Sequence, residues 1–213
     1  MKHLKQLFML FILFCSLVMP STVLAATSSS SSSAVSSSTN SNQTARDDSL
    51  QKIKQKGTLV VGMSTDYPPY EFTTKKNGKT EYVGFEVDLA KKFAKDLGVK
   101  LVIKNMDFDS LLVALETGKI DVIISGMNIT NERKKSVDFS NTYYSGNSYF
   151  LINKADKKRF STAKDFKGKT VGAQNGTLQS TMINKSMPGT KNKGLAKLSN
   201  LVIGLQSHKV DAV

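Results

Sequence analysis

Residues 84–103 read GFEVDLAKKFAKDLGVKLVI, and they join a helical pattern directly to a strand pattern. Apolar side chains recur every four residues from Phe85 to Leu97, which predicts an amphipathic helix over this range. Gly98 stands where a left-handed glycine commonly ends a helix. The apolar residues that follow, from Val99 to Ile103, predict a strand.

The segments on either side repeat this alternation of strands and helices. Two more strands are expected at residues 59–63 and 120–124, and one more helix is expected between them at residues 111–116. Between the first of these strands and the helix at Phe85, Asn77-Gly78 is the expected tip of a hairpin. The β-α-β-α-β order predicts an α/β fold with a mostly parallel sheet and helices on both faces.

A second α/β unit is expected after residues 140–152, an aromatic and polar stretch that we interpret as a strand and a hinge. Its expected elements are a short helix at 162–166, a strand at 170–173, a tight turn at Asn175-Gly176-Thr177, a helix at 178–185, a helix capped by Ser199 or Asn200 that runs to Gln206, and a strand at 210–213. We therefore predict a first lobe at residues 48–145 and a second at residues 146–213.

The N-terminal segment has the pattern of an export signal. Lys2 and Lys5 precede an apolar run that Pro20 interrupts, and we expect signal peptidase to cleave after Ala25. An uncleaved anchor and a lipoprotein remain open alternatives. Residues 26–47 are dominated by serine and predict a disordered tether, with folded structure starting near Asp48. We expect the protein to be exported, to the periplasm, the cell surface or the extracellular medium.

Composition excludes several classes of function. Of the single cysteine and the two histidines, only His208 lies outside the predicted signal peptide. A disulfide framework, a zinc site of Cys and His, a thiol nucleophile and a Ser-His-Asp triad are therefore not expected. The formal charge is +13, but the basic residues are scattered rather than clustered, so we expect no nucleic-acid binding. No metal or other cofactor is expected, and we expect a monomer.

Five collinear motifs carry a resemblance to a known family. They are GMSTDYPPYEF (62–72), GFEVDLAKKFAKDLG (84–98), DFDSLLVALETGKIDVIISGMNITNERKKSVDFS (107–140), KGKTVGAQNGT (167–177) and LQSHKVDAV (205–213). Together they resemble the extracellular solute-binding proteins, family 3, of polar amino-acid ABC transporters. The resemblance implies a type II periplasmic-binding-protein fold, in which two hinged lobes close around a free amino acid. It also implies delivery of that amino acid to the permease subunits of an ABC importer, without catalysis.

The same resemblance implies the residues that hold the ligand. Arg133 matches the arginine that clamps the ligand carboxylate, a role that suits its planar fork of donors. Thr177 matches a helix start whose amides face the same carboxylate. The remaining implied contacts are Tyr67 and Phe108 around the ligand's side-chain stem, Ser125, Gly126 and Asn128 at its ammonium group, and Ser64 and Gln174 toward its side chain.

Three departures from the family pattern affect these expectations. Asn128 stands where the family more often has Ser or Thr, and its side-chain oxygen can still accept a hydrogen bond. Ser64 stands where relatives selective for basic side chains often carry Asp, which mildly favours a neutral polar ligand such as glutamine and leaves cationic ligands open. The family's Asp that binds the ligand's ammonium group would lie three residues beyond the last predicted strand. The resemblance therefore implies that the second lobe is incomplete, and so is the segment that returns from it to the first lobe.

Two other functions remain open at the level of sequence. The chain could be a ligand-sensing module of a larger receptor or wall protein, because a serine-rich tether is compatible with such a module. It could also be an exported dehydratase on the same fold, such as a cyclohexadienyl dehydratase, which would need a catalytic acid. Asp66, Glu71 and Asp109 are available, and we interpret them instead as solvated or capping residues.

Overall fold

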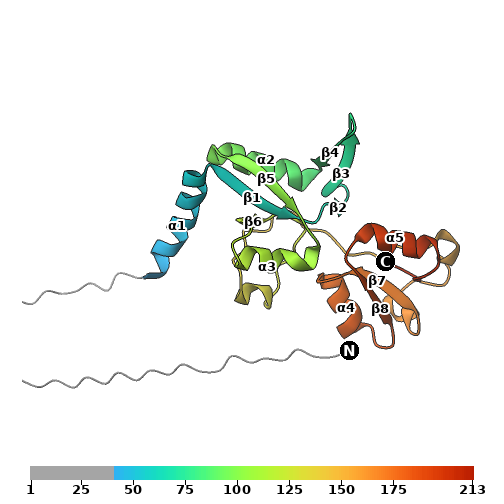
Figure 1. Cartoon of the computed structure of the whole chain (residues 1–213). Coiled ribbons are helices and arrows are strands. Elements are labelled where there is room, and N and C mark those ends of the chain that lie inside the picture. Colours follow the sequence, from blue (N-terminus) through green and yellow to red (C-terminus); the bar gives the residue numbers. More distant parts are fainter. Residues whose placement is uncertain (1–40) are drawn as a thin grey trace, which may run out of the picture. The chain divides into compact units, whose positions relative to one another are not determined.

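The computed structural model describes the backbone of residues 41–213 and the side chains of residues 48–213. The predicted signal peptide and most of the predicted tether lie outside the described residues. Helix α1 (Ser41–Lys56) includes residues 41–47, which the sequence analysis assigned to the tether (Figure 1). Within the described part of the chain, no helix has both the length and the apolar character needed to cross a membrane.

The first lobe is built on a three-stranded parallel sheet. Strand β1 (Thr58–Met63) pairs on one side with β5 (Lys100–Asn105) and on the other with β6 (Val122–Ile123). Helices α2 (Phe85–Leu97) and α3 (Leu111–Glu116) lie on opposite sides of this sheet (Figure 1). This arrangement confirms the predicted alternation and the parallel sheet.

Helix α2 has the predicted ends, and four residues of its predicted apolar face lie in or against the core, namely Leu89, Ala90, Ala94 and Leu97. Gly98 has a left-handed φ of 68°, and its N–H donates to the carbonyls of the last helical turn. The side chains that face the core are Val87, Ala90 and Ala94, whereas Phe85 and Phe93 are 46% and 49% exposed. Small residues allow α2 to lie close to the sheet, so the larger aromatic rings remain at the edge of the contact.

A hairpin projects from the first lobe between β1 and α2. Its strands are β3 (Glu71–Lys76) and β4 (Lys79–Val83), and the short β2 (Asp66–Tyr67) pairs with β3. Asn77 and Gly78 have φ values of 50° and 74° at the tip, as a two-residue hairpin turn requires. The predicted hairpin tip is confirmed.

The second lobe has a smaller parallel sheet and two α-helices. Strand β7 (Thr170–Gln174) pairs with β8 (Lys191–Leu195), and α4 (Leu178–Ser186) and α5 (Leu198–Gln206) pack against them. Its core comprises Phe160, Phe166, Val171, Ala173, Ile183, Met187 and Ala212. The sequence analysis missed β8, because the KNKGL segment has neither alternation nor a β-branched run.

Short 3-10 helices connect these elements. They are η1 (Phe108–Ser110), η2 (Arg133–Lys135), η3 (Lys154–Asp156) and η4 (Ala163–Phe166). Helix η4 falls within the helix predicted at residues 162–166, and Thr162 caps it in a capping box with Asp165.

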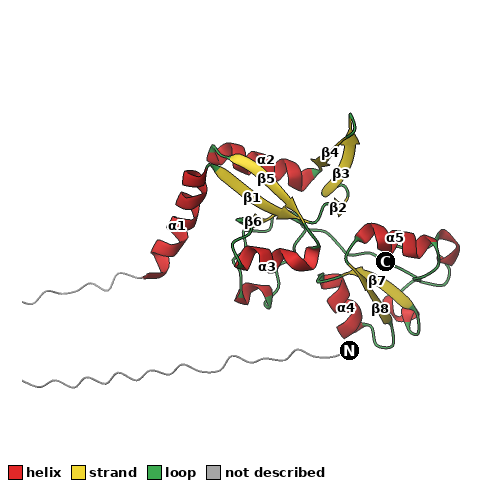
Figure 2. Cartoon of the chain, viewed as in Figure 1, coloured by secondary structure: helices red, strands yellow, loops and turns green. Residues whose placement is uncertain are grey.

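Of three sequence predictions in or near the second lobe, two are wrong and one, the strand at 210–213, is confirmed in part. Residues 141–150 are exposed and form no strand, because no neighbouring strand pairs with them; the segment is drawn as loop in Figure 2. In the predicted strand at 210–213, only Ala212 forms bridges, with Ile152 and Val171. Val213 exchanges backbone hydrogen bonds with Leu151, and the Gly172 N–H donates to the Ala212 carbonyl. The N-cap of α5 is Lys197 rather than Ser199 or Asn200.

We predict that Gly84→Ala destabilises the fold more than Gly78→Ala does. Gly84 has a φ of 122°, and a Cβ there would lie 2.3 Å from the Tyr70 carbonyl oxygen, so the backbone would have to move. A Cβ at Gly78 would meet no atom within 4 Å, which leaves only a left-handed penalty of about 1 kcal/mol. We expect Gly84→Ala to lower the free energy of unfolding by more than about 2 kcal/mol in urea titrations. Equal losses in the two variants would contradict this packing.

Candidate functional site

The predicted ligand-binding residues of the first lobe follow the carboxyl ends of its parallel strands. Ser64 comes directly after β1, and Phe108 comes shortly after β5. Ser125 and Gly126 come shortly after β6. In a parallel sheet these ends meet at one edge, which is where α/β proteins bind their ligands. Residues far apart in the sequence are therefore brought together here.

A buried chain of hydrogen bonds fixes this edge of the sheet. The Ser64 N–H donates to Ser125 Oγ at 2.8 Å, and Ser125 Oγ–H donates to Glu71 Oε1 at 2.9 Å. The three residues are at most 2% exposed. The chain ties the end of β1 to the segment after β6 and to the first residue of β3.

The most unusual feature of the site is a pair of buried carboxyl groups, Glu71 and Glu86. The Gly126 N–H donates to both Glu86 oxygens, at 2.8 and 2.9 Å, and the Tyr143 hydroxyl donates to Glu86 Oε1. Glu71 Oε2 has no hydrogen-bond donor beside it. If both Glu71 and Glu86 were ionised, each carboxylate could only accept, so neither could donate to the other. Burial and the adjacent Glu86 raise the pKa of Glu71 from its usual 4.5 to about 10.

We infer that Glu71 keeps its proton at neutral pH and that this O–H donates a hydrogen bond to Glu86. The hydrogen bond satisfies Glu71 Oε2, which otherwise has no partner. The interpretation of Glu71 as a solvated or capping residue is wrong. Neither glutamate was identified from the sequence as part of the site, because patterning arguments place an isolated Glu at the surface. The signal that could have found them is the presence of both acids inside motifs that carry the family resemblance.

Arg133 joins the two lobes. One guanidinium nitrogen donates to the Asn128 carbonyl at 2.6 Å, and the other donates to the Gly176 carbonyl, in the second lobe, at 2.9 Å. The guanidinium also lies over the Phe108 ring, 5.6 Å from its centroid. Within residues 48–213 no carboxylate lies at ion-pair distance from it, and burial lowers its pKa.

The two predicted aromatic contacts have different surroundings. Phe108 is buried beneath Arg133, whereas Tyr67 is 44% exposed and stacks on Tyr70 with ring centroids 5.0 Å apart. A Cβ built on Gly126 would lie 3.7 Å from the Tyr67 ring and 4.0 Å from Glu71 Oε1. Gly126 therefore lies beside both the Tyr67 ring and the buried acid. The role of the two rings in holding a ligand stays a prediction.

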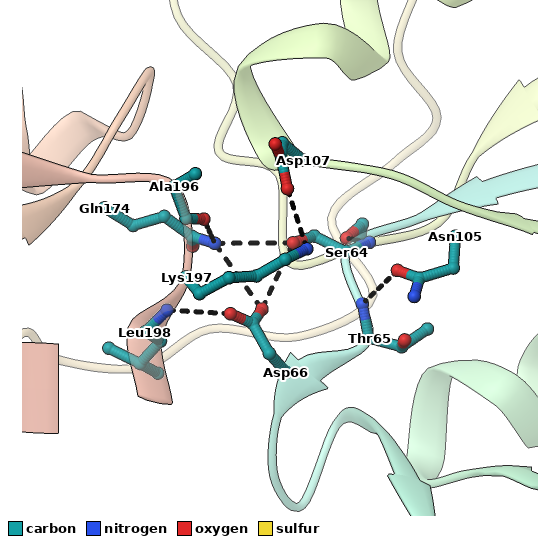
Figure 3. A network of polar contacts seen from close by, with 10 residues as sticks. Ser64, Thr65, Asp66, Asn105, Asp107, Gln174, Ala196, Lys197 and Leu198 are labelled. Carbon is teal, nitrogen blue, oxygen red and sulfur yellow. Dashed lines mark hydrogen bonds and ion pairs between the residues drawn. The ribbon is translucent and has the colours of Figure 1, made fainter. Parts of the chain in front are cut away.

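The predicted residues of the second lobe lie at the end of β7 and the start of α4. Thr177 is the N-cap of α4, since its hydroxyl oxygen accepts the Ser180 N–H at 3.2 Å. The Gln174 side-chain amide donates to the Ala196 carbonyl at 2.9 Å and reaches across to Ser64 Oγ at 3.3 Å (Figure 3). Asn128 is exposed and contributes its backbone carbonyl to Arg133, so the predicted role of its side chain stays a prediction.

Asp66 is a further site residue that the sequence analysis interpreted as solvated or capping. Its carboxylate accepts hydrogen bonds from Ser64 Oγ at 3.1 Å, from Gln174 Nε2 at 3.4 Å and from the Leu198 N–H at 2.7 Å (Figure 3). The last of these contacts shows that Asp66 does cap a helix, namely α5 of the second lobe. Among the residues whose side chains are described, no three His, Cys, Asp or Glu side chains gather into a possible metal site.

Comparison with known proteins identifies the family. Residues 59–203 match "Bacterial extracellular solute-binding proteins, family 3". The arginine-binding extracellular protein ArtP of Bacillus subtilis is 40% identical over 159 residues, which are 74% of this chain and 60% of ArtP. The L-cystine-binding protein TcyJ of Escherichia coli K12 is 34% identical over 79% of this chain and 62% of its own. The chain thus spans about 60% of the length of these curated relatives, and both are binding proteins rather than enzymes.

Solved structures show the same fold. A substrate-binding protein of an amino-acid ABC transporter from Streptococcus pneumoniae, bound to L-arginine, aligns with a TM-score of 0.75 and 39% identity over 78% of this chain and 69% of its own. The holo form of ArgBP from T. maritima aligns with a TM-score of 0.72 and 44% identity, over 76% of this chain and 70% of its own. These alignments confirm the predicted periplasmic-binding-protein fold.

We predict that Glu71 makes the fold less stable as the pH rises. Above the usual glutamate pKa of 4.5 the unfolded chain releases this proton, while the folded protein holds it up to a pKa of about 10. The unfolded state then binds fewer protons than the folded state, so the free energy of unfolding falls across this interval. In Glu71→Gln we expect this fall to shrink by more than about 1 kcal/mol between about pH 6 and pH 9 in urea titrations.

The exposed Glu116 provides the matched control for this experiment. Glu116→Gln removes one carboxyl at the surface and should leave the pH dependence of the wild type unchanged. If Glu71→Gln and Glu116→Gln show the same pH dependence of the free energy of unfolding, the inference that Glu71 is protonated in the folded protein is contradicted.

Proposed function

Because the chain belongs to the bacterial extracellular solute-binding proteins of family 3, we propose that it captures a free amino acid between its two lobes and delivers it to the permease of an ABC importer. The family is extracellular, which agrees with the export signal expected at residues 1–25. We propose further that residues 48–145 and 146–213 are the lobes that close on the ligand. Cleavage after Ala25 and a surface tether between Ala25 and α1 are part of the same proposal.

The observation that carries this proposal is the position of Arg133 at the junction of the lobes. Its two terminal nitrogens donate to carbonyls from different lobes, at Asn128 and Gly176. A carboxylate accepts two parallel hydrogen bonds from a guanidinium and is a stronger acceptor than two separate carbonyls. An amino-acid carboxylate that replaces these carbonyls would thus interact with a residue at the point where both lobes meet.

The acidic groups around this point favour a ligand with a positive charge beyond its carboxylate. Glu71 and Glu86 are buried together, and a Cβ at Gly126 would lie in ordinary contact with both the Tyr67 ring, at 3.7 Å, and Glu71 Oε1, at 4.0 Å. A cationic side chain close to Glu71 would lower the pKa of this carboxyl, which burial and the adjacent Glu86 otherwise raise to about 10. The aligned relatives named or shown as arginine-binding support the same preference.

We therefore propose a cationic amino acid, with L-arginine as the first ligand to test. The absence of Asp at Ser64 had favoured a neutral ligand such as glutamine. That argument considered one position, whereas the buried Glu71–Glu86 pair supplies acidic groups from β3 and α2. Ser64 itself donates to Asp66, so its hydroxyl is already engaged within the first lobe.

Calorimetric titration of the purified chain with L-arginine, L-glutamine and L-cystine tests the proposed function. We expect L-arginine to bind most tightly and to raise the unfolding temperature with increasing concentration. Arg133→Ala should weaken this binding by at least about 100-fold, because the ligand carboxylate would lose its charged partner. Arg133→Lys should retain part of the affinity, since it keeps the charge and loses the planar fork.

Arg159→Ala is the matched control, because Arg159 also forms a cation–π contact but pairs with Asp156 within the second lobe. It should bind L-arginine as the wild type does. The Arg133 assignment is contradicted if Arg133→Ala binds as tightly as Arg159→Ala. A chain whose unfolding temperature no amino acid changes would contradict the function itself.

A further inference from the structure

We propose that the start of α5 is a latch that holds the second lobe against the first in the absence of any ligand. The latch comprises Asp66 and Asp107 of the first lobe with Lys197 and Leu198 of the second (Figure 3). These residues would set the balance between closed and open forms, and hence how firmly a captured ligand is retained. None of them is required to touch the ligand.

The first contact of the latch completes a helix end. The N-cap residue of α5, Lys197, provides no side-chain acceptor for the free N–H groups of the first turn. Asp66 provides one from β2, 132 positions earlier, at 2.7 Å from the Leu198 N–H. A carboxylate at a helix N-terminus also interacts favourably with the helix dipole. Opening the lobes would leave α5 without its cap.

The second contact is an ion pair formed by the neighbouring residue. Lys197 Nζ lies 2.8 Å from Asp107 Oδ1, and the two side chains are 35% and 45% exposed. Asp107 immediately precedes η1, which carries Phe108, and Asp66 is paired with β3 next to Tyr67. The latch therefore positions both segments that carry the predicted aromatic contacts.

A close backbone approach accompanies these polar contacts. Gly176, with a φ of 74°, lies so near Asp109 that a Cβ would be 2.9 Å from the Asp109 Cβ. The turn before α4 thus meets the first lobe at the segment that follows Asp107. The surfaces fit at this point only because residue 176 has no side chain.

The latch is suited to reversible closure. Partly exposed ion pairs and single helix caps are each weak interactions, so breaking one changes a two-state balance by a modest factor. The apparent affinity of a binding protein scales with the fraction of molecules in the binding-competent form. Tuning the latch would therefore change ligand retention without replacing any of the predicted ligand-binding residues.

Distance measurements between spin labels on the two lobes test this inference without ligand. In a Cys15→Ser background, Lys91→Cys on α2 and Lys185→Cys on α4 provide exposed labelling positions, and pulsed electron resonance reports their separations. We expect one main population in the wild type. Asp66→Ala and Lys197→Met should each raise the fraction of longer separations about five-fold.

A charge exchange separates the latch from a general loss of structure. Asp107→Lys should open the lobes strongly, because it places two cations together, and the combination of Asp107→Lys with Lys197→Asp should restore the wild-type distances. Lys193→Met, which removes an exposed lysine from β8, should leave the distances unchanged. The latch is refuted if the single variants match the wild type, if the exchanged pair stays open, or if the ligand-free wild type is already open. Failure of amino-acid binding would not affect these outcomes.

Discussion

The buried carboxyl pair of Glu71 and Glu86 governs where the residues of the candidate site lie, because a buried acid tolerates few arrangements of its neighbours. Glu71 holds Ser125 and, through it, Ser64, while Glu86 holds the Gly126 amide and the Tyr143 hydroxyl. The hairpin, α2, the end of β1 and the segment after β6 thus converge on two side chains. Packing of the sheet alone would not fix these polar groups relative to one another.

Charge is distributed over the site in a way that the overall composition conceals. The chain has a formal charge of +13, yet the edge of the first lobe gathers four acidic residues, Asp66, Glu71, Glu86 and Asp107. Of these, Asp107 forms an ion pair with Lys197, whereas Arg133 donates to backbone carbonyls. In the proposed function the carboxylate of the ligand would approach Arg133, which donates to two backbone carbonyls and forms no ion pair within residues 48–213. Apart from Lys197, the scattered lysines contribute to the net charge but not to this pattern.

The sequence predicted local structure well where a single segment contains all the physical causes. The bounds of α2, its glycine end and the hairpin tip at Asn77-Gly78 are examples, since each depends on residues within one or two turns. Prediction failed where the cause lies elsewhere in the chain. The cap of α5 comes from Asp66, and the burial of Glu71 depends on Glu86 and Ser125, which no periodicity reveals. The predicted site residues followed from the family motifs rather than from local pattern. Two of their contacts cross between the lobes, from Arg133 to the Gly176 carbonyl and from Gln174 to Ser64.

The contact between Asp66 and the Leu198 amide has a consequence for how motion of the lobes can be observed. A backbone hydrogen exchanges with solvent when its hydrogen bond opens, and here the acceptor belongs to the other lobe. Exchange of this one amide would therefore report the opening of the lobes, while amides in the middle of α5 would report the unfolding of the helix. A single backbone proton can thus record the opening of the lobes separately from the stability of the fold.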